Sequence, residues 1–287
     1  MTTAPQKSDR WIVLSILILA SAVFSAVLFY ARRTGMLCLD DAYITFRYAE
    51  NLASRKGFVY NAGEHILGTT TPFFCLLLAG LRMIGIKIPV AADLINLFSA
   101  IFSSIVIFLL GRQAKNRTAG LNASLMFICF PYFWLNLPSG METMFTIFLA
   151  LVLVLLDLKE RPVLAGLVAG LLLLTRIDAL ALLAGVALMR FFQNRKQAII
   201  LVSICLLTLL PWLIFSQLYF GSIIPQSRQH KTKKRSGAPE HALPGIKNQS
   251  PGQSQILSIA ESDISVIKAE HPGLARIQED AGKNRSS

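Results

Sequence analysis

The stretch Trp11–Ala31, WIVLSILILASAVFSAVLFYA, decides the fold, because it is an apolar run long enough to cross a bilayer. Similar runs recur as far as Phe220. The 287-residue chain is 54% hydrophobic and only 15% charged, whereas soluble proteins are about 25% charged. Backbone groups in lipid must satisfy one another, and the alternation of barrel strands is missing. We therefore predict an all-α, polytopic transmembrane helical bundle.

Seven apolar runs are expected to cross the membrane, and one shorter run is not. Segment 72–86 is about 15 residues long, which is short for a span, and Gly80, Arg82 and Gly85 interrupt it. We predict that it lies at the interface or re-enters. The first run exceeds the apolar core of a signal peptide, which favours an uncleaved span. The predicted spans are residues 11–31, 89–110, 118–137, 143–158, 163–175, 179–192 and 198–219.

The distribution of basic residues sets the predicted orientation. If segment 72–86 does not span, the clusters at 112–117, 159–161 and 190–196 all fall on the cytoplasmic side, as the positive-inside rule requires. Residues 1–10 are then a cytoplasmic N-terminus and residues 32–71 an external loop, with Arg32 and Arg33 as the exception. This loop continues into the interfacial segment, and the membrane domain covers residues 11–225. The polar composition of residues 226–287 predicts a disordered tail.

Composition also excludes two classes of function. The formal charge of +12 does not indicate nucleic-acid binding, because polytopic proteins concentrate Lys and Arg in cytoplasmic loops. The four cysteines are widely separated and form no CxxC or Cys/His cluster, so neither a zinc site nor a disulfide framework is expected.

The long polar loop opens with Asp40 and Asp41, which are the first candidates for chemistry. Two neighbouring carboxylates in a poorly hydrated pocket hold one proton more firmly, and one of them could act as a general base. The alternative is an N-cap for an amphipathic helix over 42–53. Both roles can hold together.

Three further charged residues are predicted on the same external face. Glu142 is interpreted either as part of the site or as a first-turn acid of the following helix. Arg176 and Asp178 interrupt an apolar run, and suit either a phosphate-binding cation with its counter-ion or an ion pair within a helical hairpin. Charged groups at membrane depth usually mark function. Because no other charged groups are expected to be buried in the bundle, these groups predict one shared cavity.

The loop DDAYITFRYAENLASRKGFVYNAGEHILGTTTP (40–72) resembles the first external loop of GT-C membrane glycosyltransferases. The nearest resemblance is to bacterial relatives of the arabinofuranosyl- and protein-mannosyltransferases that use polyprenyl-phosphate sugars. GMET at 140–143, TRID at 175–178 and FGSIIPQS at 220–227 occur in a similar order. The departure from the family pattern is the polar chain after Pro225, which is typical of a truncated or frameshifted copy.

This resemblance implies inverting sugar transfer from a polyprenyl-phosphate donor to a cell-envelope glycan, lipid or protein, at the external face of a bacterial inner membrane. Asp40 or Asp41 would be the base. Arg176 and Lys231 would neutralise the leaving phosphate, with Asp178 and Glu142 in the substrate-binding set. Mg²⁺ or Mn²⁺ could bind the paired acids, although a lipid-monophosphate donor has no evident need of a metal. The alternative function is a transporter or flippase for an amphiphile, which predicts mid-membrane charges and repeat symmetry.

Overall fold

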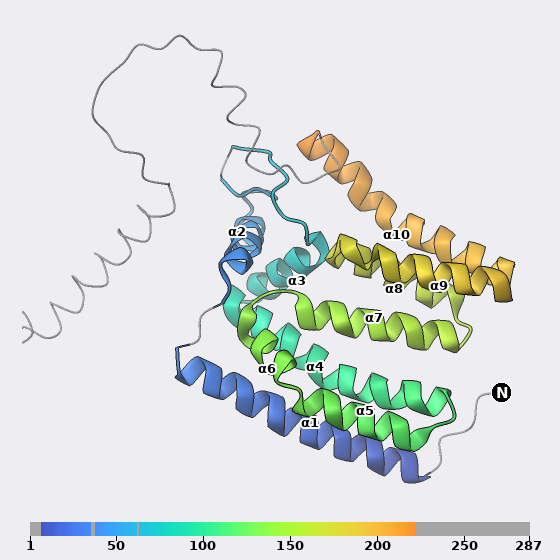
Figure 1. Ribbon diagram of the computed structural model, residues 1–287. Helices are drawn as coiled ribbons and strands as arrows, with labels where there is room; N and C mark the ends of the chain where they lie inside the picture. The colour runs from blue at the N-terminus through green and yellow to red at the C-terminus, as the bar shows by residue number, and fades with distance from the viewer. Residues whose placement is uncertain (1–6, 36–37, 62, 222–287) are drawn as a thin grey trace, which may run out of the picture. The chain divides into compact units, whose positions relative to one another are not determined.

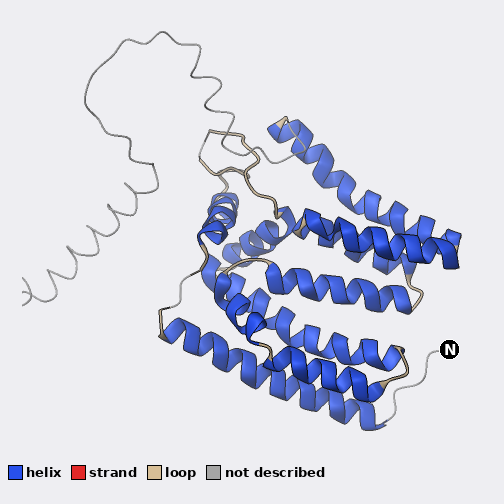
Figure 2. Cartoon of the chain, viewed as in Figure 1, coloured by secondary structure: helices blue, strands red, loops and turns tan. Residues whose placement is uncertain are grey.

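Apolar helices make up almost all of the structure, a computed structural model that describes residues 7–35, 38–61 and 63–221. These residues belong to one unit, Met1–Thr232, and no strand occurs among them (Figure 2). The elements are α1 (Lys7–Arg33), α2 (Asp40–Ala53), α3 (Pro72–Met83), α4 (Ile88–Gln113), α5 (Arg117–Cys129), α6 (Pro131–Asn136), η1 (Leu137–Ser139), α7 (Thr143–Leu158), α8 (Pro162–Thr175), η2 (Ile177–Ala179), α9 (Leu180–Gln193) and α10 (Arg195–Phe220).

The polytopic all-α fold predicted from the sequence is confirmed. Three helices are long and apolar enough to cross a membrane, namely Asp9–Arg33, α4 and α10. A fourth span results if α5 and the following helical segment, which meet at a bend of 51°, count as one. The bend falls at Pro131, which has no N–H to continue the helical hydrogen bonds. The predicted spans at α7, α8 and α9 form helices of 16, 14 and 14 residues.

Close helix contact in the bundle depends on two glycines of α8. A Cβ on Gly166 would lie 2.5 Å from the Leu201 carbonyl oxygen, and one on Gly170 would lie 2.5 Å from Cβ of Thr208. This is the small-xxx-small spacing that lets membrane helices approach closely. The backbone of α8 therefore packs closely against both backbone and side-chain atoms of α10 along one seam.

Helix α3 is short and packed against its neighbours. It has 12 residues, which at 1.5 Å per residue is about 18 Å, well below the roughly 30 Å hydrocarbon core. Phe74, Cys75 and Leu78 are fully buried, in a cluster with residues of α2 and α4. The interfacial placement of segment 72–86 stays a prediction, because the predicted spans α8 and α9 are only two residues longer.

The three basic clusters lie at one end of the helices, on the right in Figure 1, and contacts link the segments that carry them. Asp9 lies 3.4 Å from Arg112 and 3.3 Å from Arg117. Gln113 donates a hydrogen bond of 3.2 Å to the Leu158 carbonyl. Arg190 is paired with Asp157 at 2.9 Å. The charge pattern therefore predicted correctly which helix ends lie together.

The prediction that no charged groups are buried elsewhere in the bundle is wrong. Asp9, Asp93 and Arg190 are each less than 9% exposed. Each has an opposite charge within ion-pair distance, and a partner is what makes a buried charge tolerable. Pairing across helices, which a hydropathy profile does not register, explains the error.

Candidate functional site

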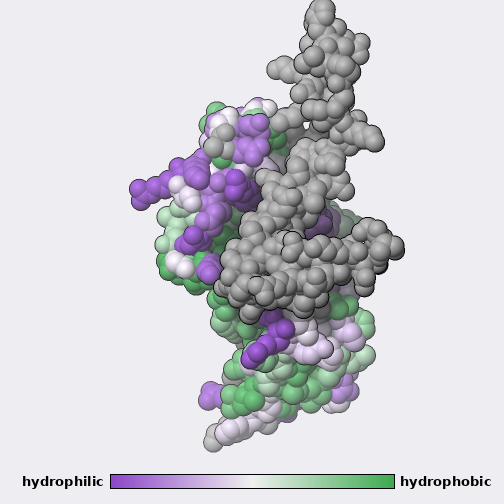
Figure 3. All heavy atoms as spheres, turned by 90° about the vertical axis from the view of Figure 1, so that its left-hand side faces the viewer, coloured by the Kyte–Doolittle hydropathy of each residue, from purple (hydrophilic) through white to green (hydrophobic). Residues whose placement is uncertain are grey.

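The candidate site lies at the end of the helices opposite the basic clusters, where α2, the 54–71 loop and the start of α7 meet (Figure 1). Viewed from that side, hydrophilic side chains gather over the upper part of the face and hydrophobic surface lies beside and below them (Figure 3). The opposite end has more Lys and Arg than Asp and Glu, whereas residues 32–71 at this end carry both charges in similar number.

Asp40 and Asp41 form the first turn of α2, and both are exposed. The expectation that one of them caps a helix over 42–53 is wrong, because α2 begins two residues earlier, at Asp40. The N-cap residue is Leu39, and no side chain makes a capping hydrogen bond. Acids in a first turn still interact favourably with the helix dipole. Both carboxylates are therefore available to solvent.

The start of α2 is joined to the segment that leads to Glu142. The Leu39 amide donates to the Ser139 carbonyl at 2.9 Å. Gly140 follows with a φ of +74°, and a Cβ there would lie 2.9 Å from Cβ and Sγ of Cys38 and from Cζ of Phe46. Only glycine meets both demands without strain. The glycine of the GMET motif thus allows this turn to pack closely against α2.

Glu142 lies at the N-cap position of α7 but makes no capping hydrogen bond. Its carboxylate accepts instead from Nη1 of Arg176 at 3.1 Å, while Nη2 of Arg176 donates to Asp178 at 2.9 Å. Nε of Arg176 also donates to Asp178, at 3.1 Å. The structure therefore brings three predicted residues into one cluster of two carboxylates on one guanidinium, which includes the ion pair within the hairpin.

The two carboxylates of this cluster titrate differently. Burial raises the pKa of Glu142, and the nearby Arg176 only partly opposes that shift. The hydrogen bonds from Arg176 lower the pKa of Asp178, whose side chain is 65% exposed. Asp178 is thus the stable counter-ion, and Glu142 is the group that takes up a proton more readily.

A partly buried ion pair that sequence reasoning missed supports the same segment. Arg32, at the end of α1, donates from Nε and Nη2 to the two oxygens of Asp93 in α4, with 2.8 Å for the Nε bond. Nη2 also donates to the Pro138 carbonyl at 3.2 Å. Nδ2 of Asn96 donates to the Met141 carbonyl at 2.9 Å. Arg32 of α1, held by Asp93 of α4, and Asn96 of α4 thus fix segment 137–142 through two of its carbonyls.

Two signals in the sequence could have revealed this pair. Arg32 violates the positive-inside rule, which invites a search for a counter-ion. Asp93 stands inside the predicted span 89–110, where an acid is costly unless it has a partner. Neither signal alone indicates that the two residues meet.

The loop after α2 is a packed structure as well. The Tyr48 hydroxyl donates to the Ile66 carbonyl at 2.6 Å and accepts from the Gly68 amide at 2.9 Å. Phe58 is buried against Trp212 of α10, with ring centroids 5.4 Å apart. The ring of His65 lies 4.4 Å from that of Tyr219. The last turns of α10 therefore join the same end of the bundle.

The remaining predicted features can be placed only in part. Lys231 lies outside the described residues, as does the segment 222–227 of the FGSIIPQS motif. Among residues 7–35, 38–61 and 63–221, no three His, Cys, Asp or Glu side chains gather in a group that could hold a metal ion.

Fold and site together define a multi-pass, all-α membrane protein with a charged cluster at one end of its helices. Residues 69–255 match the model of Glycosyltransferase family 87, which spans more than half of the chain, and the chain belongs to this family. No match was found among curated proteins or solved structures. Glu142, Arg176, Asp178 and Lys231 lie within the matched stretch, whereas Asp40 and Asp41 precede it.

Proposed function

We propose that this membrane glycosyltransferase moves a sugar from a polyprenyl-phosphate donor to a cell-envelope acceptor, with inversion at the anomeric carbon. The observation that carries the proposal is that one end of the bundle joins the exposed acids of α2 to the Glu142–Arg176–Asp178 cluster through segment 137–142. The basic clusters at the opposite end support a bacterial inner membrane with the site facing outward.

Asp40 or Asp41 would serve as the general base. The carboxylate takes the proton of an acceptor hydroxyl, whose oxygen forms a bond to the anomeric carbon of the donor sugar. The bond between that carbon and the phosphate oxygen breaks, and the polyprenyl phosphate leaves with the electron pair. Both carboxylates are exposed, as approach of an acceptor from water requires. If Mg²⁺ or Mn²⁺ takes part, these two acids would be its protein ligands.

Arg176 would bind the leaving phosphate. A guanidinium has five N–H groups, and its bonds to Glu142 and Asp178 engage Nε and one N–H on each terminal nitrogen. One N–H on each terminal nitrogen therefore stays available to a phosphate oxygen. Asp178 is mostly exposed, so a phosphate can also displace it from Arg176. Buried Glu142 keeps the guanidinium aligned. Lys231 completes this proposed phosphate site, and a fixed cation stabilises the developing charge.

The experiment is a transfer assay in membranes with a radiolabelled polyprenyl-phosphate sugar. Asp40→Asn combined with Asp41→Asn should abolish transfer at unchanged protein level, and Arg176→Gln should lower it at least about tenfold. Glu160→Gln, an exposed acid at the turn between α7 and α8, is the matched control and should leave it unchanged. Transfer that survives in the double variant would overturn the base assignment. Addition of EDTA to the same assay tests whether transfer needs a metal ion.

The same membranes separate transfer from transport. An amphiphile transporter or flippase would move the lipid-linked sugar across the bilayer without joining it to an acceptor. The proposal would give way to a transport function on two results together. The lipid-linked sugar would still cross the bilayer in the double Asp variant, and the parent chain would yield no glycosylated product.

A further inference from the structure

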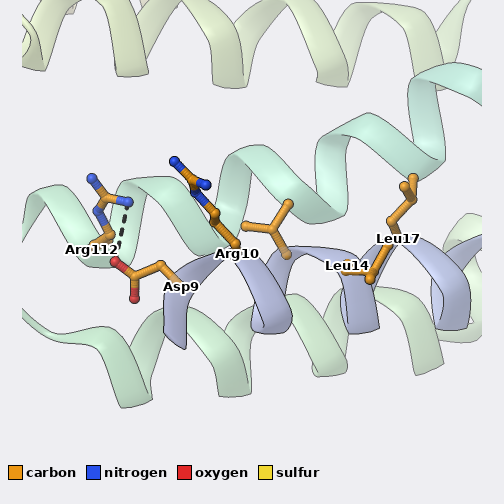
Figure 4. A pocket seen from close by; sticks show the side chains of 6 residues that line it. Asp9, Arg10, Leu14, Leu17 and Arg112 are labelled. Carbon is orange, nitrogen blue, oxygen red and sulfur yellow. Dashed lines mark ion pairs between the residues drawn. The ribbon is translucent and has the colours of Figure 1, made fainter. Parts of the chain in front are cut away.

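A pocket lies at the opposite end of the bundle from Asp40 and Asp41. It has a volume of about 330 Å³ and is lined by Asp9, Arg10, Val13, Leu14, Leu17 and Arg112. Figure 4 shows Arg10 rising from α1 beside α4, with Leu14 and Leu17 further along the same helix. From this pocket we infer that the protein binds the phosphate of an anionic phospholipid at Arg10 and one of its acyl chains along the two leucines.

The spacing along α1 matches the depth profile of a lipid. Arg10, Leu14 and Leu17 recur at intervals of four and three residues, which places them on one face of a helix. At 1.5 Å per residue, Leu14 lies about 6 Å and Leu17 about 10 Å deeper than Arg10. The apolar span begins at Asp9. Arg10 is therefore at headgroup depth and the leucines are at acyl-chain depth.

Charge at the pocket favours an anion. The carboxylate of Asp9 is buried and lies between Arg112 at 3.4 Å and Arg117 at 3.3 Å, so its charge is already compensated. Arg10 is exposed and forms no ion pair with any other described residue. Three arginines around one acid leave a positive balance at the pocket. Basic pockets between membrane helices are known to hold acidic headgroups.

The apolar wall decides between a lipid and a soluble phosphate. Val13, Leu14 and Leu17 contribute half of the lining residues, and Leu14 is 42% exposed. A soluble anion makes no use of such a wall. An acyl chain can lie along this wall and gain dispersion contacts with all three side chains.

The test uses the purified full-length chain in detergent, with bound lipid measured by native mass spectrometry and thermal stabilisation. Phosphatidylglycerol should bind and stabilise more strongly than phosphatidylcholine with the same acyl chains. Arg10→Gln should weaken phosphatidylglycerol binding about fivefold, the effect of one basic residue near a membrane surface. The matched control, Arg161→Gln, changes a basic residue at the same end but outside the pocket and should have less than a twofold effect.

A second pair of variants tests the acyl-chain wall without altering charge. Leu14→Trp fills the pocket and should abolish the preference for phosphatidylglycerol. Leu19→Trp, on the same helix with a similar exposure of 41% but outside the pocket, should keep it. Equal effects within either pair, equal binding of phosphatidylcholine, or full stabilisation by inorganic phosphate alone would each overturn the inference. None of these measurements depends on sugar transfer.

Discussion

The partly buried Arg32–Asp93 pair allows an asymmetric prediction about stability. Arg32→Met leaves the Asp93 carboxylate without its cation, and that side chain is only 11% exposed. Asp93→Asn leaves Arg32, whose side chain is 32% exposed and still donates to the Pro138 carbonyl at 3.2 Å. The stranded carboxylate should therefore cost more than the stranded guanidinium.

The magnitudes follow from the burial of each group. Removing one partner of a fully buried pair costs about 3–5 kcal/mol. Because water reaches the Arg32 end, we expect about 3 kcal/mol for Arg32→Met. Loss of hydrogen bonds alone in Asp93→Asn should cost about 1–1.5 kcal/mol. Since about 1.4 kcal/mol is a tenfold change in an equilibrium constant, the first variant should shift the folded-to-unfolded ratio more than a hundredfold.

Equilibrium unfolding in mixed detergent micelles, followed by tryptophan fluorescence, measures these differences. The double variant Arg32→Met with Asp93→Leu removes both charges and should lie within about 1 kcal/mol of the parent, because apolar replacements of buried pairs are often neutral. Two results would refute the reasoning. One is an Asp93→Asn variant that is as unstable as Arg32→Met, and the other is a double variant whose loss equals the sum of the single losses.

Three further predictions concern packing, titration and the loop. Gly170→Ala should lower the free energy of unfolding by about 1–3 kcal/mol, because the added Cβ crowds Thr208. Gly185→Ala, where a Cβ meets nothing within 4 Å, should stabilise α9 by about 0.5–1 kcal/mol. Equal melting shifts for the two variants would contradict the close packing of α8 against α10. The raised pKa of Glu142 means that the folded state keeps a proton that the unfolded state has already lost. Stability should therefore fall as pH rises from about 4.5 through the folded-state pKa, and Glu142→Gln should flatten this part of the pH–stability profile; an unchanged slope would assign it to another group. Tyr48→Phe leaves the Gly68 amide and the Ile66 carbonyl without their side-chain partner, which should lower the free energy of unfolding by about 1–3 kcal/mol. Proteolysis of the 54–70 loop should become faster. Cleavage at the parent rate would show that the hydroxyl does not hold the loop.

The contribution of sequence patterns is clearest at the ends of the helices. The runs predicted at 89–110 and 198–219 lie within α4 and α10, because hydrophobicity over about 20 residues is a local property that a bilayer selects. The basic clusters were correctly assigned to one end. The chain reverses direction at each span, so the number of spans before a loop determines the end at which that loop lies. The order of GMET and TRID likewise indicated that Glu142 and Arg176 lie at the same end.

Pairings between distant residues required the tertiary structure. Arg32 and Asp93 are 61 residues apart, and Glu142 and Arg176 are 34 apart, so their contact depends on how α1 rotates against α4 and α7 against α8. The N-cap of α2 is Leu39, whose amide donates to Ser139, and not an aspartate as capping preference predicted. Hydropathy and charge by themselves determined a membrane bundle with its basic clusters at one end. Which charges meet within each end was decided only by packing, because ion-pair energies change over a few ångströms while a hydropathy profile averages over whole helices.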